Sequence, residues 1–149
     1  MTVIVETDRN IFNLDVDVIV NAVNTVGIMG CGIALECKKR YPEMYQRYRT
    51  YCATGQLTTG KLWLYKHSTP SVLCFPTKEH WQNPSKMEWI ESGLDKFATL
   101  WPLMGYSSIA FPMLGCGRGN LNPVSVEELM VKKLRPLSGK IYICKKLTK

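Results

Sequence analysis

Residues 16–34 read VDVIVNAVNTVGIMGCGIA, and the order of residue types in this stretch decides the fold. The run VDVIVNAV (16–23) is rich in β-branched residues and predicts a strand. A loop with three glycines follows, and GIALECKKRY (32–41) then predicts a helix. A strand that leads through a short turn into a helix is the repeating unit of α/β domains.

The same alternation of strands and helices continues over the rest of the chain. In the segment 84–105, apolar residues recur at spacings of three and four, which predicts an amphipathic helix that ends near Pro102. Pro42 and Gly55 are expected to start and stop another helix. Further strands are predicted at 2–6, 61–66, 71–75, 107–112 and 140–147, and a last helix at 124–134. These elements predict a three-layer α/β/α domain around a mixed, mostly parallel sheet.

The length and hydropathy of the chain indicate one soluble domain. With 149 residues, of which 46% are hydrophobic, the chain is long enough for one core and too short for two, so 1–149 is expected to form a single domain. No run of about 18 apolar residues occurs, and MTVIVETDRN lacks the pattern of a secretory signal. We therefore expect a cytoplasmic protein without membrane contact, and a monomer by default.

The cysteines and the net charge narrow the kinds of partner. The six cysteines form no CxxC pair and no zinc-finger spacing, so reduced thiols and no metal site are expected. No cofactor is expected either. With 19 Lys and Arg against 12 Asp and Glu, the net charge is +7. This charge favours an anionic partner such as a phosphate-bearing ligand or a nucleic acid.

Two glycine-rich loops follow predicted strands, where α/β domains bind ligands. The first contains Gly27, Gly30 and Gly32, and the second, in PMLGCGRGNLNP (112–123), contains three more glycines. Glycines let backbone N–H groups approach a phosphate, and two such loops facing each other would clamp a diphosphate. The alternative is that the glycines only make turns. No GK[ST] follows, so the first loop is not a Walker loop.

A third stretch, FPTKEHW (75–81), completes a pattern that resembles a known family. The order NAVNTVGIMGCGIAL, FPTKEHW, PMLGCGRGNLNP covers most of the chain and resembles a macrodomain, the ADP-ribose-binding module. It is most similar to the DNA ADP-ribosyl glycohydrolase branch, the DarG antitoxins that reverse DarT modification of DNA. This resemblance implies ADP-ribose as ligand, ADP-ribosylated single-stranded DNA as substrate and a DarT-like toxin as possible partner.

The resemblance also implies a role for individual residues. Asn21 and Asn24 would lie near the ribose that carries the scissile bond, with Asn24 as the direct contact. Lys78 would be the catalytic lysine, with His80 close by and Thr77 among the ligand contacts. The first loop would contribute Gly30, Cys31, Gly32 and Ile33, and the second Gly115, Cys116, Gly117, Arg118 and Gly119.

Two positions depart from the family pattern. Macrodomains commonly place an acid against the adenine amine where this chain has Asn10, so adenine contact would fall to Asn10 or to the backbone of Ile11. DarG-like sequences often read Leu-Asp-Trp where this chain has LNP, with Asn122 in place of the acid. The missing acid leaves open a slower or more selective enzyme. The chain also has no room for the C-terminal region of DarG-like proteins, so it is either an excised domain or a stand-alone hydrolase.

The chemistry of the loops supports Lys78 independently. Ordinary glycoside hydrolysis needs two carboxylates, and Glu79 is the only acid in the three stretches. An amine can attack the anomeric carbon, including through a Schiff base, provided that its pKa is lowered by burial or nearby positive charge. Alternatively, Lys78 stays charged and stabilises the leaving base. Because Glu79 would raise that pKa, its carboxylate is expected to point elsewhere.

Three functions therefore remain open. The leading one is removal of ADP-ribose from DNA bases, and the others are hydrolysis of ADP-ribosyl esters on acidic side chains and non-catalytic reading of ADP-ribose. Trp81 and Trp89 are expected to pack in the core or at the rim, although an exposed Trp81 would stack on a base. The clusters at 38–40 and 132–135 are expected to be solvated helix faces, or to suit a DNA strand if one lies near the pocket.

Overall fold

The computed structural model describes residues 2–146, which form one six-stranded sheet in the order β1-β6-β5-β2-β4-β3. All neighbouring strands are parallel except β3, which runs antiparallel to β4. The elements are β1 (Thr2–Thr7), η1 (Ile11–Asn13), β2 (Val18–Asn24), α1 (Gly32–Arg40), α2 (Pro42–Ala53), β3 (Trp63–Tyr65), β4 (Ser71–Lys78), α3 (Met87–Met104), β5 (Ser108–Pro112), α4 (Pro123–Leu134) and β6 (Gly139–Cys144). The predicted mixed, mostly parallel α/β fold is confirmed.

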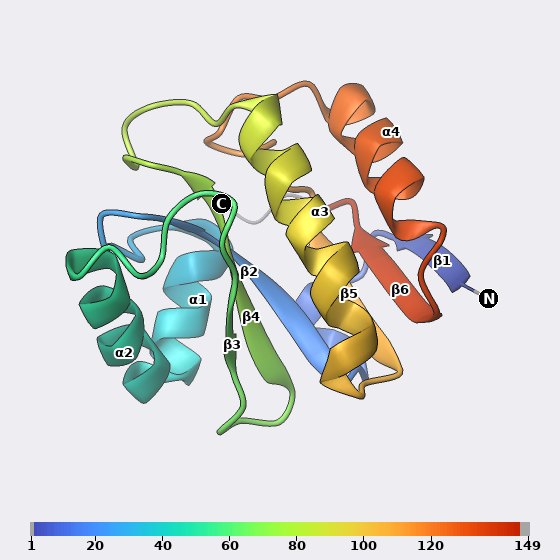
Figure 1. Ribbon diagram of the computed structural model, residues 1–149, viewed down its shortest axis with the longest axis horizontal. Helices are drawn as coiled ribbons and strands as arrows, with labels where there is room; N and C mark the ends of the chain where they lie inside the picture. The colour runs from blue at the N-terminus through green and yellow to red at the C-terminus, as the bar shows by residue number, and fades with distance from the viewer. Residues whose placement is uncertain (1, 147–149) are drawn as a thin grey trace.

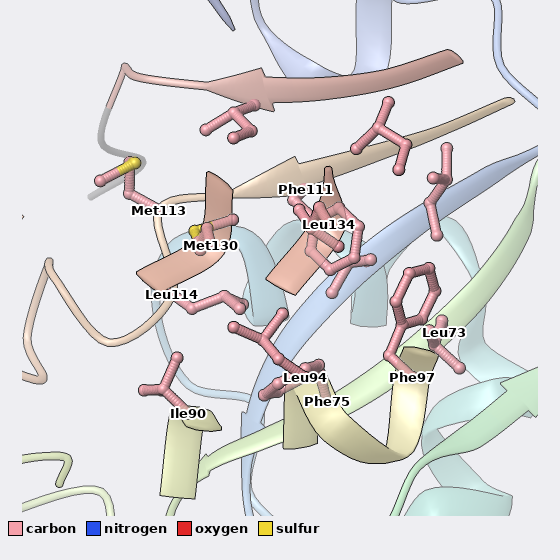
Figure 2. Packing of buried hydrophobic residues seen from close by; sticks show 14 of the residues in the cluster. Leu73, Phe75, Ile90, Leu94, Phe97, Phe111, Met113, Leu114, Met130 and Leu134 are labelled. Carbon is pink, nitrogen blue, oxygen red and sulfur yellow. The ribbon is translucent and has the colours of Figure 1, made fainter. Parts of the chain in front are cut away.

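Helices cover both faces of the sheet, so the molecule has three layers (Figure 1). Helices α3 and α4 pack on one face, and α1 and α2 pack on the other, each pair over its own cluster of buried apolar residues. Figure 2 shows Phe97 of α3 beside the strands, where its ring lies edge-on to Phe111 at 5.0 Å. Burying side chains of this size stabilises the fold by about 1.5–3 kcal/mol each.

Helix α3 starts later and ends later than the sequence pattern predicted. It begins at Met87 because Lys86 is extended, and it continues past Pro102 to Gly105, whose φ of 78° closes it. A proline removes only its own N–H bond, so the residues after Pro102 can still complete the last turn. Gly93 lets this helix approach β4, because a Cβ there would overlap the Phe75 ring.

Strand β4 extends three residues beyond the predicted end at Phe75 and includes Pro76. The register with β2 shifts after Val23, so that Val23 pairs with Pro76 and Asn24 pairs with Lys78. A bulge of this kind accommodates a proline, which has no N–H to donate. Lys78 therefore lies at the end of a central strand. At the C-terminus, β6 ends at Cys144, and the predicted strand residue Leu147 lies outside the described residues.

The described part of the chain was expected to have no membrane-spanning helix and no metal site. No helix between residues 2 and 146 has both the length and the hydrophobicity to cross a bilayer. In the same range, no three His, Cys, Asp or Glu side chains gather as metal ligands would. All six cysteines are free, and Cys31 is the exposed one among them.

Candidate active site

A cavity of about 450 Å³ opens at the carboxyl edge of the sheet, between the two glycine-rich loops. Because β2, β4 and β5 are parallel, their carboxyl ends bring the first loop, Lys78 and the second loop to this one edge. Most of the residues predicted as site residues line it. They are Asn24, Gly30, Cys31, Gly32, Ile33, Thr77, Lys78, Gly115, Gly117, Arg118 and Gly119.

Other lining residues were not predicted, and the most informative are Ile28, Trp81 and Lys146. The sequence indicated Trp81 only as an aromatic residue that would stack on a base if exposed. Lys146 lies outside the three motifs, so no sequence pattern pointed to it. Lys78, Arg118 and Lys146 are the cations among the described lining residues, which include no Asp or Glu. The charge of this cavity therefore suits an anionic ligand.

Lys78 is held at the mouth of the cavity. Its Nζ donates a hydrogen bond of 3.1 Å to the Trp81 carbonyl oxygen. Burial lowers the pKa of Lys78 below its usual value, and the like charge of Arg118 lowers it further, while Cys31 opposes both effects. Within residues 2–146 no ion pair joins Lys78 to Glu79, in line with the expectation for that carboxylate. The amine is thus closer to neutrality than an ordinary surface lysine.

Both side-chain amide atoms of Asn24 form hydrogen bonds to the first loop. Its Nδ2 donates to the Ile28 carbonyl oxygen at 2.7 Å, and its Oδ1 accepts from the Val26 and Ile28 N–H groups at 3.3 Å. The hydroxyl of Tyr48, fully buried on α2, lies 2.8 Å from the same Oδ1 and 2.7 Å from the Asn24 carbonyl oxygen. The sequence predicts a helix around Tyr48, but a helix pattern does not reveal where a hydroxyl points.

The first glycine loop is joined directly to the loop that follows β4. The Thr25 N–H and hydroxyl both lie 3.2 Å from the Glu79 carbonyl oxygen. Trp81 is 47% exposed beside them, and its ring stacks on His80 at 5.3 Å. The mouth therefore presents an aromatic face next to Lys78.

The structure places five predicted site residues away from the cavity. Asn21 is fully buried, with Nδ2 near the sulfurs of Met29 and Cys74 and Oδ1 without a partner among the described residues. It lies on the α1 and α2 side of β2, because strand side chains alternate between faces. The other four do not line the cavity either: Asn10, Ile11, His80 and Cys116.

Local contacts account for the positions of these four residues. Asn10 caps η1 by accepting from the Phe12 N–H at 2.9 Å, and Ile11 behind it is buried. His80 Nδ1 accepts from the Gln82 N–H at 3.1 Å. Burial raises the pKa of Cys116 to about 11, so it remains a thiol at neutral pH.

The glycines of the second loop have different roles. Gly115 has a φ of 70°, and a Cβ on it would lie 2.7 Å from Leu121 Cδ1. A Cβ on Gly119 would overlap the Gly115 carbonyl oxygen and the Ser85 hydroxyl, whereas one on Gly117 would meet nothing within 4 Å. Gly115 and Gly119 are therefore required for packing, and Gly117 leaves space at the cavity.

Asn122 is a helix cap. Its Oδ1 accepts from the Val124 and Ser125 N–H groups at 2.9 and 3.2 Å, at the start of α4. The side chain does not line the cavity. An aspartate would cap this helix equally well, so the structure gives a local reason for a short polar residue at this position.

Comparison with known proteins agrees with this geometry. The family model described as Macro domain matches residues 20–130. A DNA ADP-ribosyl glycohydrolase of Thermus aquaticus is 37% identical over 134 residues, which cover 87% of this chain and 37% of that relative. The chain thus spans little more than a third of that curated relative.

Two solved structures are similar over nearly the whole chain. The macrodomain of Thermus aquaticus DarG matches with a TM-score of 0.91 and 33% identity, covering 97% of this chain and 99% of that one. Thermosipho africanus DarTG in complex with ADP-ribose matches with a TM-score of 0.86 and 34% identity, covering 93% of this chain and 40% of that one. The resemblance inferred from the three motifs is confirmed.

Proposed function

Because this chain belongs to the Macro domain family, we propose that it is an ADP-ribosyl glycohydrolase that removes ADP-ribose from modified DNA bases, with thymidine as the expected base. The observation that carries the proposal is Lys78, an amine of lowered pKa at the mouth of a cavity whose described lining has no carboxylate. The similarity to DNA ADP-ribosyl glycohydrolases supports the same reaction.

ADP-ribose suits the size and charge of the cavity. A volume of about 450 Å³ lies within the usual range of ligand sites. The two glycine loops offer backbone N–H groups to a diphosphate, and Arg118 and Lys146 add positive charge. Helix α1 starts at Gly32 in the first loop, so its dipole also favours an anion there.

Two mechanisms are compatible with a lysine in this position. In one, the neutral amine attacks the anomeric carbon while the bond to the base breaks, and the base leaves with the electron pair and takes up the proton that the amine loses. Ring opening then gives a Schiff base that water hydrolyses to free ADP-ribose and the amine. In the other, the ammonium stabilises the departing base while water attacks. The lowered pKa of Lys78 favours the first mechanism.

A nucleobase as leaving group is supported by the surroundings of Lys78. Lys78 donates to the main-chain carbonyl oxygen of Trp81, and Trp81, which is 47% exposed, lines the same cavity. Aromatic side chains of this kind stack on unpaired bases. The net charge of +7 further favours a substrate that carries phosphates.

The biological setting follows from the proposed substrate. We expect a DarT-like transferase to supply the ADP-ribosylated DNA, so the protein would act as an antitoxin that repairs cellular DNA in the cytoplasm. We expect it to act as a monomer and as a single domain over 1–149.

The test is release of ADP-ribose from a single-stranded oligonucleotide carrying ADP-ribosylated thymidine. We expect wild type and the control Lys96→Ala, an exposed lysine of α3, to release ADP-ribose, and Lys78→Ala to lose release. Titration calorimetry should show that all three bind ADP-ribose. Binding without release by wild type would contradict the proposal, and the same assay on an ADP-ribosylated glutamate peptide would then separate an ester hydrolase from a reader.

A further inference from the structure

Helices α1 and α2 carry a group of two cations around one aromatic ring. Lys38 Nζ lies 4.6 Å from the centroid of the Tyr45 ring, and Arg49 Cζ lies 5.7 Å from it. We call these three residues the α2 ridge. Contact with the ring restricts both side chains, so the two charges are held in place before any ligand arrives.

Two neighbouring arginines have carboxylate partners, which the ridge cations lack. On the same two helices, Arg40 pairs with Glu36 at 3.1 Å and Arg47 pairs with Glu43 at 2.9 Å. Within residues 2–146, Lys38 and Arg49 form no such ion pair. Their charges are therefore available to an external anion. Of the basic cluster at 38–40, only Lys38 contacts Tyr45 and belongs to the ridge.

The ridge adjoins the mouth of the cavity. A Cβ on Gly27 would lie 3.7 Å from the Arg49 Cα, so the first loop rests on α2 at this residue. Next in the loop comes Ile28, which is 44% exposed and lines the cavity. Figure 1 shows this loop above the end of α2. A strand leaving the cavity over Ile28 thus meets Arg49 first, then Tyr45 and Lys38.

We propose that the α2 ridge binds the phosphates of the single-stranded DNA that flanks the modified base. The inference rests on the proposed function, since it extends the substrate outward from the same cavity. Lys38 Nζ and Arg49 Cζ lie 4.6 and 5.7 Å from the same ring centroid, so the two charges are at most about 10 Å apart, or about three phosphate spacings of a DNA strand. A single strand fits because a base must leave a duplex stack before it can enter a cavity.

The first experiment measures binding of an unmodified, fluorescein-labelled single-stranded oligonucleotide by anisotropy over a range of salt concentrations. The test protein is the double variant Lys38→Ala/Arg49→Ala. The control is Arg40→Ala/Arg47→Ala, which removes the same charge from the same helices at ion-paired positions. Losing two phosphate contacts should make the slope of log affinity against log salt shallower by about 1.4 in the test variant. The slope of the control should be unchanged.

The second experiment compares two substrates for ADP-ribose release. The ridge variant should act more slowly than wild type on an ADP-ribosylated oligonucleotide and at the wild-type rate on ADP-ribosylated thymidine alone. The ridge proposal would be overturned if the two double variants changed strand binding equally. It would also be overturned if wild type did not bind the strand. If wild type binds the strand through the ridge but releases no ADP-ribose, the proposed function fails while the ridge stands. If wild type releases ADP-ribose and the ridge variant behaves like the control variant, the ridge fails while the proposed function stands.

Discussion

At the scale of single residues, the environment of Lys78 decides its chemistry. Its place at the end of β4, opposite Asn24, follows from the register shift between β2 and β4. Partial burial and Arg118 lower the pKa of the amine, so a larger neutral fraction exists near neutral pH than for a free lysine. A neutral amine is a nucleophile, whereas an ammonium acts only through its charge.

The pH dependence of release distinguishes these two roles. If the neutral amine attacks, activity should rise with pH and level off at the pKa of Lys78, below its ordinary value of 10.5. Lys78→Arg should then be inactive, because a guanidinium does not lose its proton. The measurement is the rate of release against pH for both proteins. Activity that falls as the pH rises, together with partial activity of Lys78→Arg, would assign the electrostatic role instead.

At the scale of elements, the glycines of the second loop meet two different requirements. The second loop packs on Ser85, whose N–H donates to the Gly119 carbonyl oxygen at 2.9 Å, so it is tied to the loop that leads into α3. Gly119 has no room for a side chain, while Gly117 is open to the cavity. One loop thus contains a glycine needed for the fold and another that leaves space for the ligand.

Alanine substitutions at the two glycines should separate stability from binding. Gly119→Ala should destabilise the protein by roughly 1–3 kcal/mol, because overpacking against backbone is costly, and lower Tm by several degrees. Gly117→Ala should leave Tm nearly unchanged but weaken ADP-ribose binding roughly tenfold by narrowing the cavity. Thermal unfolding and titration calorimetry on both variants provide the measurement. Unchanged ADP-ribose affinity in Gly117→Ala would place the ligand elsewhere.

At the scale of the whole molecule, the two edges of the sheet have separate tasks. The cavity lies at the carboxyl ends of the strands. At their amino ends, Asp17, just before β2, links β2 to β5. Its carboxylate accepts from the Ser107 and Ser108 N–H groups at 2.8 and 3.1 Å, at the start of β5. These bonds, that from the Ser107 N–H above all, lower the pKa of Asp17, and the opposing effect of desolvation does not cancel them. The charged form therefore stabilises the folded state.

Asp17→Asn should lower stability without affecting the cavity. The contribution of a carboxylate with a lowered pKa is present above its unfolded pKa of about 3.9 and is lost as pH falls through the folded value. We expect Tm at pH 7 to fall by a few degrees, with the difference from wild type disappearing at strongly acidic pH, while ADP-ribose affinity stays unchanged. Asp15→Asn, a nearby exposed position, is the control in thermal unfolding. An equal loss of stability in both variants would contradict the role of Asp17.

The sequence determined the element order, the three layers and the two glycine loops of this protein. Hydrophobic periodicity and glycine or proline punctuation are local signals, and they locate α3 to within a few residues of Met87–Met104. Most of the predicted lining residues came from the resemblance of the three motifs to macrodomains, and they meet because parallel strands bring their carboxyl ends to one edge of the sheet. The resemblance also implied Lys78, and the lack of a carboxylate pair in the three stretches supported it independently.

Only the tertiary structure decided how those residues are used. The bulge that places Lys78 opposite Asn24, the Tyr48 hydroxyl that holds Asn24, and the burial of Asn21 all depend on contacts between distant segments. The two unpaired cations of the α2 ridge emerge only when α1, α2 and the first loop are packed together. The pairs Arg40–Glu36 and Arg47–Glu43 are local, since each joins residues four apart on one helix. The contact of Lys38 with Tyr45 joins two helices, and no local pattern in the chain encodes it.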